Sequence, residues 1–168
     1  LAAFSFHETK NLICGEGGML VVNDPAYAAR AEILWEKGTN RAAFFRGEVA
    51  KYNWVDVGSS FLPSELNAAF LFARLENLQE IQRRRIALWQ RYEAGLAPMA
   101  EAGKLALPQL PGYATQNGHL FYLLTQDLET RTALIAHLKA QGISAVFHYI
   151  SLQKSPYYLQ HHSEVDLP

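Results

Sequence analysis

The sequence has 168 residues, of which 49% are hydrophobic and 18% charged, and its formal net charge is −1. This composition is typical of a globular protein with one ordinary core, not of a disordered chain. The lack of a basic excess argues against a nucleic-acid partner, and no apolar run reaches the roughly 20 residues that cross a bilayer. The single cysteine, Cys14, fits a reducing cytosol. We therefore expect a cytoplasmic protein that binds neither nucleic acid nor membrane, with Cys14 as a buried space-filler rather than a reactive thiol.

The stretch from residue 4 to residue 18 carries the strongest chemical pattern. Phe4–Phe6 reads as a short apolar strand, and a polar segment with one lysine, Lys10, follows it. The glycine cluster at 15–18 can adopt positive φ or let another group approach the backbone closely, and Met19–Val22 reads as a second strand. A lysine held between two buried strands is a candidate amine nucleophile for carbonyl compounds, including pyridoxal phosphate (PLP). On spacing alone, such a lysine is more often a solvated surface residue.

The spacing of Ser5, Phe6, Lys10 and residues 15–18 resembles the active-site pattern S-F-x-x-x-K-x-x-x-x-G-E-G-G of the DegT/DnrJ/EryC1/StrS sugar aminotransferases. The resemblance implies that Lys10 holds PLP as a Schiff base and moves protons once the substrate amine has displaced it. It also implies that Ser5 hydrogen-bonds the PLP phosphate. Dehydratases that resemble this family have histidine in place of the lysine, so Lys10 favours an aminotransferase.

A helix is predicted from Asp24 as N-cap and Pro25 as first helical residue to about Lys37, with Gly38 as its C-cap. We predict a long irregular segment over 38–60, in which aromatic residues alternate with arginine and lysine. Loops of this length are often functional. Guanidinium groups bind phosphates and aromatic faces stack on bases and sugars, which suits a nucleotide-sugar ligand. The equally open alternative is that the aromatic residues anchor the segment and its charges are solvated.

Segment 38–60 also resembles one branch of the family, which makes dTDP-4-amino-4,6-dideoxygalactose and serves lipopolysaccharide and enterobacterial common antigen biosynthesis. The resemblance implies that Arg41 and Tyr52 bind substrate, and that the segment reaches the partner subunit of a homodimer. Most family members read G-x-N-x-R where this chain has residues 58–62, and the asparagine reaches a PLP phosphate of the neighbouring subunit. Ser60 supplies a hydroxyl there instead, so its phosphate-binding role stays open. The matching motifs are K-G-T-N-R at 37–41, F-F-R-G at 44–47, K-Y-x-W at 51–54 and G-S-S at 58–60.

The longest predicted helix begins at Pro63–Glu65 and continues, with a possible kink, through an apolar stripe to Leu96. We expect Pro98 and Gly103 to end it. A stripe this broad implies burial on more than one side, as at a domain or subunit contact. The run Arg83–Arg85 is predicted to be a solvated face, with an anion site as the less favoured alternative.

Beyond this helix, His119–Thr125 reads as a buried strand and Ile143–Ile150 as another. A helix capped by Thr130 and ended by Gly142 lies between them, which predicts the start of a small α/β domain.

His148 and Tyr149 resemble the family's H-Y motif near the substrate mouth, although a lone strand histidine is more often structural. Residues 151–153 depart from the P-L-H that often follows this motif. The pair His161-His162 has no other ligands at fixed spacing, so no metal site is predicted.

The resemblance implies an α/β protein of the fold-type I PLP-dependent transferases, similar to aspartate aminotransferase. Residues 1–62 would end the large PLP-binding domain, 63–103 form a connecting helix, and 104–168 belong to an incomplete small C-terminal domain. We therefore expect a piece of a longer protein. In the family, the carboxylate facing the pyridine nitrogen and the ring-stacking aromatic precede this region, so residues 1–168 alone should neither transaminate nor hold PLP tightly.

The implied reaction moves an amino group from L-glutamate to C4 of dTDP-4-keto-6-deoxyglucose. Two alternatives stay open. The protein could be an aminotransferase or dehydratase acting on another nucleotide-linked keto-sugar, or the chain could be a non-catalytic dimerisation or binding module.

Overall fold

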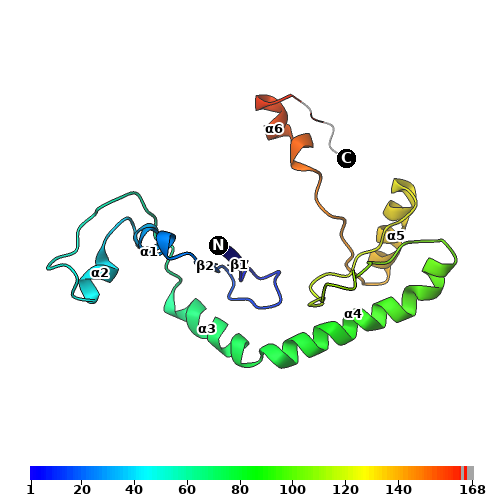
Figure 1. Ribbon diagram of the computed structural model, residues 1–168. Helices are drawn as coiled ribbons and strands as arrows, with labels where there is room; N and C mark the ends of the chain where they lie inside the picture. The colour runs from blue at the N-terminus through cyan, green and yellow to red at the C-terminus, as the bar shows by residue number, and fades with distance from the viewer. Residues whose placement is uncertain (164, 166–168) are drawn as a thin grey trace. The chain divides into compact units, whose positions relative to one another are not determined.

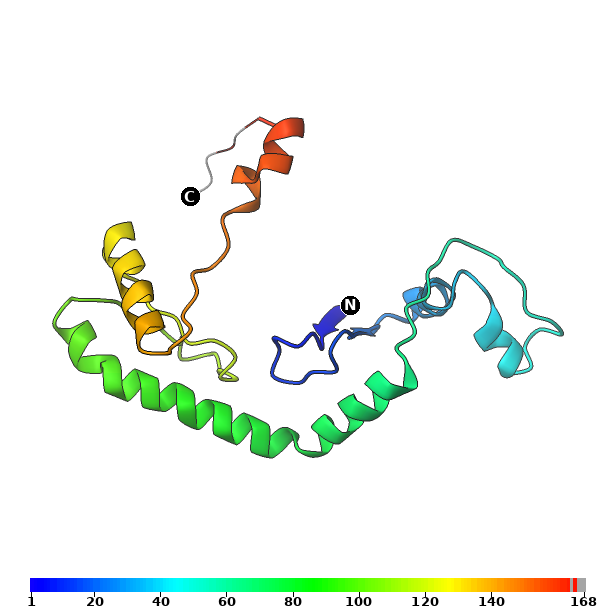
Figure 2. The same ribbon diagram turned by 180° about the vertical axis from the view of Figure 1, so that it is seen from behind.

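The computed structural model describes residues 1–163 and residue 165, and Figures 1 and 2 show the chain from two sides. The chain divides into two compact units. The first consists of Leu1–Leu96 with Pro108–Phe121, and the second of Ala97–Leu107 with the residues from Tyr122 onward. The two units are treated separately below.

The predicted domain boundaries after residues 62 and 103 remain predictions. Residues 164 and 166–168, which belong to the predicted small domain, lie outside the described residues.

Two short strands open the first unit. β1 (Ala2–Ser5) and β2 (Gly18–Val21) pair antiparallel, with Ala2 opposite Val21 and Ser5 opposite Gly18. This confirms two strands flanking the lysine segment, each displaced slightly from the predicted range. The expectation that the strands are buried is wrong for this chain, because β1 is exposed along its length. Within the described part of the chain, no other helix or strand packs against the pair.

A 3₁₀ turn, η1 (Pro25–Tyr27), leads into helix α1 (Ala28–Trp35). The carboxylate of Asp24 accepts a hydrogen bond from the backbone nitrogen of Ala26 at 2.9 Å, which confirms the predicted cap. The helix ends slightly earlier than expected because both Lys37 and Gly38 have positive φ, 63° and 75°.

A short helix, α2 (Arg41–Phe45), lies inside the segment predicted to be irregular. The alanines of this segment favour helix. The prediction missed the helix because a single turn is too short to show a periodic pattern. Gly47 ends the turn with φ 76° and donates its backbone N–H to the carbonyl of Phe44 at 2.9 Å.

Two helices follow, α3 (Glu65–Glu76) and α4 (Leu78–Glu101), and they are separated at Asn77. The break confirms the predicted kink, and the hydroxyl of Ser64 caps α3 by accepting from the nitrogen of Asn67 at 3.2 Å. Pro98 does not end α4 but lies within its last turn. A proline removes one backbone hydrogen bond, and this loss near the terminus leaves the final turn in place. Gly103, with φ 68°, follows one residue beyond the end of the helix.

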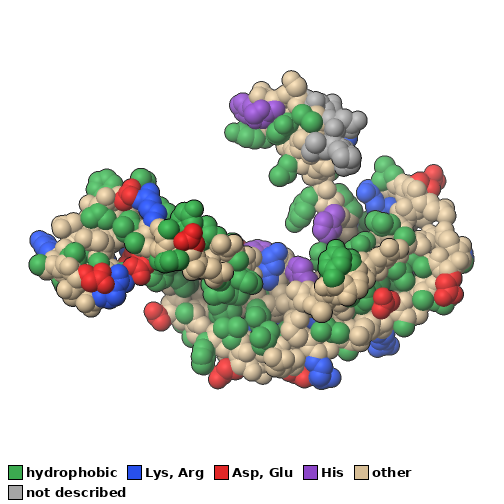
Figure 3. All heavy atoms as spheres, viewed as in Figure 1, with side chains coloured by type: hydrophobic (Ala, Val, Ile, Leu, Met, Phe, Trp, Pro, Cys, Tyr) green, Lys and Arg blue, Asp and Glu red, His purple; other side chains and the backbone are tan. Residues whose placement is uncertain are grey.

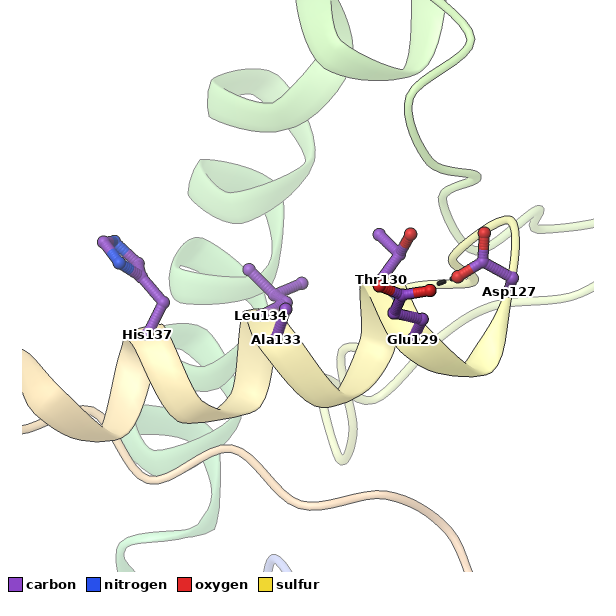
Figure 4. A pocket seen from close by; sticks show the side chains of 6 residues that line it. All are labelled: Asp127, Glu129, Thr130, Ala133, Leu134 and His137. Atoms are coloured by element: carbon purple, nitrogen blue, oxygen red, sulfur yellow. Dashed lines mark hydrogen bonds between the residues drawn. The ribbon is translucent and has the colours of Figure 1, made fainter.

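The second unit contains α5 (Leu128–Ala140), the 3₁₀ turn η2 (Leu152–Lys154) and α6 (Pro156–His161). The N-cap of α5 is Asp127 and not Thr130, since an oxygen of Asp127 accepts from the nitrogen of Thr130 at 2.7 Å. Figure 4 shows this end of the helix. The backbone hydrogen bond from Thr130 is the largest cause that lowers the pKa of Asp127.

The strands predicted at 119–125 and 143–150 are not formed in the described structure. Residues 119–125 contribute only one isolated bridge, between Ala106 and Leu124. An apolar run becomes a strand only when another strand satisfies its backbone groups, and neither run has such a partner among the described residues.

Few hydrophobic side chains are buried. Of the residues described, the hydrophobic ones that are buried are Cys14, with 6% exposed, and Trp89, with 8%. Figure 3 shows hydrophobic side chains open on the viewed surface. The burial of Cys14 agrees with its predicted role as a space-filler. The wide stripe of α3 is exposed, including Leu66 and Phe72. Across residues 1–163 and 165, none of the helices combines the length and the apolar character that crossing a bilayer requires.

Candidate active site

Lys10 lies on a closed loop between β1 and β2. Backbone hydrogen bonds join Phe6 N–H to the carbonyl of Gly17 and Cys14 N–H to the carbonyl of Phe6, both at 2.8 Å. Within the loop, Lys10 N–H donates to the carbonyl of His7 at 2.9 Å. The backbone beneath the lysine is therefore held in a turn, and the residue itself is half-buried.

The glycines after Lys10 fit the two roles expected of them. Gly15 has φ 81°, in the region that favours glycine. A Cβ on Gly17 would lie 2.4 Å from Sγ of Cys14, so only glycine fits over the buried thiol. This spacing lets the loop close on itself.

The residue after the lysine ties this loop to α4 and to a distant segment. Nδ2 of Asn11 donates to Oε1 of Gln82 at 2.9 Å and to the carbonyl of Asn117 at 2.8 Å. Oδ1 of Asn11 lies 2.9 Å from Nδ1 of His119. Gln82 also donates to the carbonyl of Asn117, at 3.0 Å. We call these four residues the Asn11 cluster, and the sequence patterns indicated none of them as a site residue.

The segment 117–121 is fixed against α4 by close packing. Gly118 has φ 62°, and a Cβ there would lie 2.8 Å from the backbone carbon of Arg85. The indole N–H of Trp89 donates to the carbonyl of Leu120 at 3.0 Å. The ring of Phe121 packs edge-on against Trp89, with centroids 5.2 Å apart. His119 is thereby presented to the loop that carries Lys10.

The pKa of His119 lies below its ordinary value. Burial is the largest cause, followed by the positive charges of Lys10 and Arg85. These three groups therefore share one electrostatic neighbourhood, in which the neutral form of the imidazole is favoured.

The two serines predicted to bind phosphate lie on different elements of the first unit. Oγ of Ser5, at the end of β1, accepts from the backbone nitrogen of His7 at 3.4 Å. Ser60 forms an isolated bridge with Glu36 and is exposed. Among the hydrogen bonds of the described residues, none joins Ser60 to Ser5 or to Lys10.

Arg41 and Tyr52 lie at opposite ends of a row of aromatic contacts through Phe45 and Phe44. The guanidinium of Arg41 pairs with the carboxylate of Glu36 and lies 5.0 Å from the ring centroid of Phe45. Phe44 contacts both Phe45 and Tyr52, with ring centroids 5.7 Å apart in each case. The cluster gives Arg41 a structural contact, and its predicted contact with substrate stays a proposal.

Replacing Arg41 by alanine should lower the free energy of unfolding by about 1–3 kcal/mol, because it leaves a buried carboxylate without its partner. The side chain of Glu36 is 10% exposed and that of Arg41 is 44% exposed. The double variant Glu36→Gln with Arg41→Ala should recover most of this loss. Urea unfolding of the intact gene product measures both.

Arg46→Ala provides the matched control. Arg46 forms ion pairs with Glu32 and Glu48, and all of these side chains are exposed, so the substitution should change the free energy of unfolding only slightly. If Arg41→Ala lowers the free energy of unfolding no more than Arg46→Ala does, the ion pair of Arg41 with Glu36 does not stabilise the fold.

His148 and Tyr149 belong to the second unit. Their rings are 6.3 Å apart in an edge-on arrangement, and both side chains are exposed, Tyr149 by 96%. The same unit has a hollow of about 470 Å³ along α5, which Figure 4 shows from close by. Its lining residues are Asp127, Glu129, Thr130, Ala133, Leu134 and His137.

The chain matches the DegT/DnrJ/EryC1/StrS aminotransferase family over residues 1–168 and belongs to that family. The aminotransferases of this family depend on PLP and have the type I fold of PLP enzymes.

Solved structures agree with this assignment. The aminotransferase TlmJ from Streptoalloteichus hindustanus is 28% identical with a TM-score of 0.81, and the match covers 99% of this chain and 42% of that one. DesV of S. venezuelae, crystallised with a ketimine intermediate, is 34% identical with a TM-score of 0.78, and the match covers 95% and 40%. Helicobacter pylori PseC, an aminotransferase involved in the biosynthesis of pseudoaminic acid, supports the fold alone, at 22% identity and a TM-score of 0.81 over 98% and 43%. This chain thus spans about two fifths of the length of these relatives.

The residues around Lys10 fit one end of PLP. A primary amine is the group that condenses with the aldehyde of PLP, and Lys10 forms no ion pair with any described carboxylate that would occupy its amine. The hydroxyl of Ser5, on the strand that leads into the loop, is a suitable donor to a phosphate oxygen. The loop therefore offers chemistry for the aldehyde and for the phosphate.

Proposed function

We propose that the intact gene product transfers an amino group from L-glutamate to C4 of dTDP-4-keto-6-deoxyglucose and so forms dTDP-4-amino-4,6-dideoxygalactose. It would work in the cytoplasm as a homodimer with shared active sites, in lipopolysaccharide or enterobacterial common antigen biosynthesis. The single observation that carries the proposal is Lys10, half-buried on a loop closed between two strands in a chain that matches the family throughout.

Lys10 would hold PLP and then move a proton between the substrate carbon and the cofactor, since a freed amine next to the reacting carbon can act as acid and base. Bound PLP supplies the electron sink that makes the neighbouring C–H bond acidic. Ser5 and Ser60 would hold the phosphate of PLP. The closed loop would hold the backbone that carries the lysine in one place during both half-reactions.

Four further residues would bind the nucleotide sugar. Arg41 and Tyr52 lie in one aromatic cluster, and a guanidinium beside aromatic faces suits a diphosphate attached to a base. His148 and Tyr149 are adjacent and exposed in the second unit, and they can reach a ligand without first breaking a packed contact.

Product analysis of the intact gene product, supplied with PLP, L-glutamate and a panel of nucleotide-linked keto-sugars, tests the proposal. We expect 2-oxoglutarate and a 4-amino sugar in equal amounts, with dTDP-4-keto-6-deoxyglucose as the best substrate and the galacto configuration at C4. Preference for another keto-sugar would reject the substrate, and loss of the sugar hydroxyl without amine transfer would indicate a dehydratase. No turnover of any member of the panel would favour a non-catalytic module.

A further inference from the structure

The hydrogen bonds of the Asn11 cluster can run in one direction only. The carbonyl oxygen of Asn117 can only accept, and it receives Nδ2 of Asn11 at 2.8 Å and Nε2 of Gln82 at 3.0 Å. The amide of Asn11 is therefore oriented with Oδ1 toward His119. Because Oδ1 has no hydrogen, Nδ1 of His119 must be the donor across the 2.9 Å contact.

The other ring nitrogen, Nε2, is then the atom that takes up a proton at low pH. Two positive groups face this ring, Lys10 from the loop between the strands and Arg85 from α4, and the segment 117–121 itself carries no further charged side chain. Together with burial, they lower the pKa of His119, so the ring is neutral at neutral pH with its hydrogen on Nδ1. Protonation would add a third positive charge to the same neighbourhood.

We infer that His119 is a positioning residue for Lys10, acting through Asn11. The backbone of Asn11 follows that of Lys10 directly, so a side chain that fixes Asn11 also fixes the backbone from which the lysine side chain extends. His119 is itself fixed, because Gly118 lies against the backbone of Arg85. This inference rests on the proposed function, since it assigns His119 a part in presenting the lysine that holds PLP.

Two variants of His119 separate positioning from simple packing. His119→Asn keeps an N–H donor near the place of Nδ1 but cannot titrate, whereas His119→Leu keeps similar bulk and removes the donor. His137→Asn, on the exposed face of α5, serves as the control for replacing a histidine.

In the intact gene product loaded with PLP, His119→Leu should lower kcat by about ten- to a hundredfold, the loss expected from a misdirected reacting group. KM for the nucleotide sugar should stay unchanged, because the substrate contacts are not touched. His119→Asn should retain most of the wild-type kcat, and His137→Asn should retain all of it.

A second measurement uses no activity. In PLP-free protein with ¹⁵N-labelled histidine, NMR at neutral pH should show His119 protonated on Nδ1 and bare on Nε2. As pH falls through the ordinary histidine value of about 6.5, the unfolded chain takes up a proton that the folded protein does not. Wild-type stability should therefore fall over that range, and the stability of His119→Asn should fall less.

The outcomes are distinct. Three results would each overturn the inference: a hydrogen on Nε2 of His119, an equal loss of kcat in His119→Asn and His119→Leu, or a His119→Leu variant as active as His137→Asn. None of them would overturn the proposed function as long as the wild type makes amino sugar. A wild type that forms no amino sugar would overturn the proposed function, and the inference with it.

Discussion

Replacing Lys10 by alanine in the intact gene product should abolish amino-sugar formation. The variant loses the amine that we propose holds PLP and moves the proton, and a positioned acid–base group alone contributes about 10²–10⁴-fold to a rate. We expect kcat to fall by at least that factor. The measurement is a discontinuous assay of the amino sugar from saturating keto-sugar and glutamate.

Lys139→Ala is the matched control, because Lys139 is an exposed lysine in the last turn of α5 and its loss should leave kcat unchanged. Folding of the Lys10→Ala variant is checked by its urea unfolding curve. Amino-sugar output from Lys10→Ala at the wild-type rate would rule out the assigned chemistry of this residue.

Replacing Gly118 by alanine should cause a large loss of stability. Gly118 has φ 62°, and a Cβ would lie 2.8 Å from the backbone carbon of Arg85 and 2.9 Å from its oxygen. Helix backbone cannot move aside as a flexible side chain could. We expect a loss of about 1–3 kcal/mol from strain and overpacking, measured by urea unfolding and by faster hydrogen exchange of the Trp89 indole N–H.

Substitutions at two other glycines separate backbone strain from overpacking as causes of the loss. Gly103 also has positive φ, 68°, but a Cβ there meets nothing within 4 Å, so Gly103→Ala reports backbone strain alone. Gly95 lies inside α4 in open space, and Gly95→Ala should stabilise the helix by about 0.5–1 kcal/mol. A Gly118→Ala variant no weaker than Gly103→Ala would show that the segment does not pack closely on α4.

Local signals predicted the fold where a few neighbouring residues decide it. Asp24 acts as a cap as expected, and α3 begins within the predicted Pro63–Glu65 with Ser64 as its cap, because a cap is formed by a side chain and a backbone nitrogen two or three positions away. The runs 119–125 and 143–150 were predicted to be strands and are not. Strand formation depends on a distant partner, and an apolar run alone cannot show whether that partner is present.

The same distinction holds for the candidate site. Lys10 could be predicted as the candidate PLP lysine because its spacing from Ser5 and from the glycine cluster is local and fixed. The contact between Asn11 and His119 joins residues 108 positions apart, and no helical or strand periodicity connects them. The pair of Arg41 with Glu36 was overlooked for another reason, since a glutamate beside a helix end is usually solvated, and only the structure shows that it is buried.

Borohydride reduction of the PLP-loaded gene product, followed by peptide mass mapping, tests most directly whether Lys10 carries the cofactor. Reduction should fix the phosphopyridoxyl group to the peptide that contains Lys10, in wild type and in Lys139→Ala alike, and leave Lys10→Ala unlabelled. A label on any other lysine, or an unlabelled Lys10 peptide in a protein that still makes amino sugar, would contradict it.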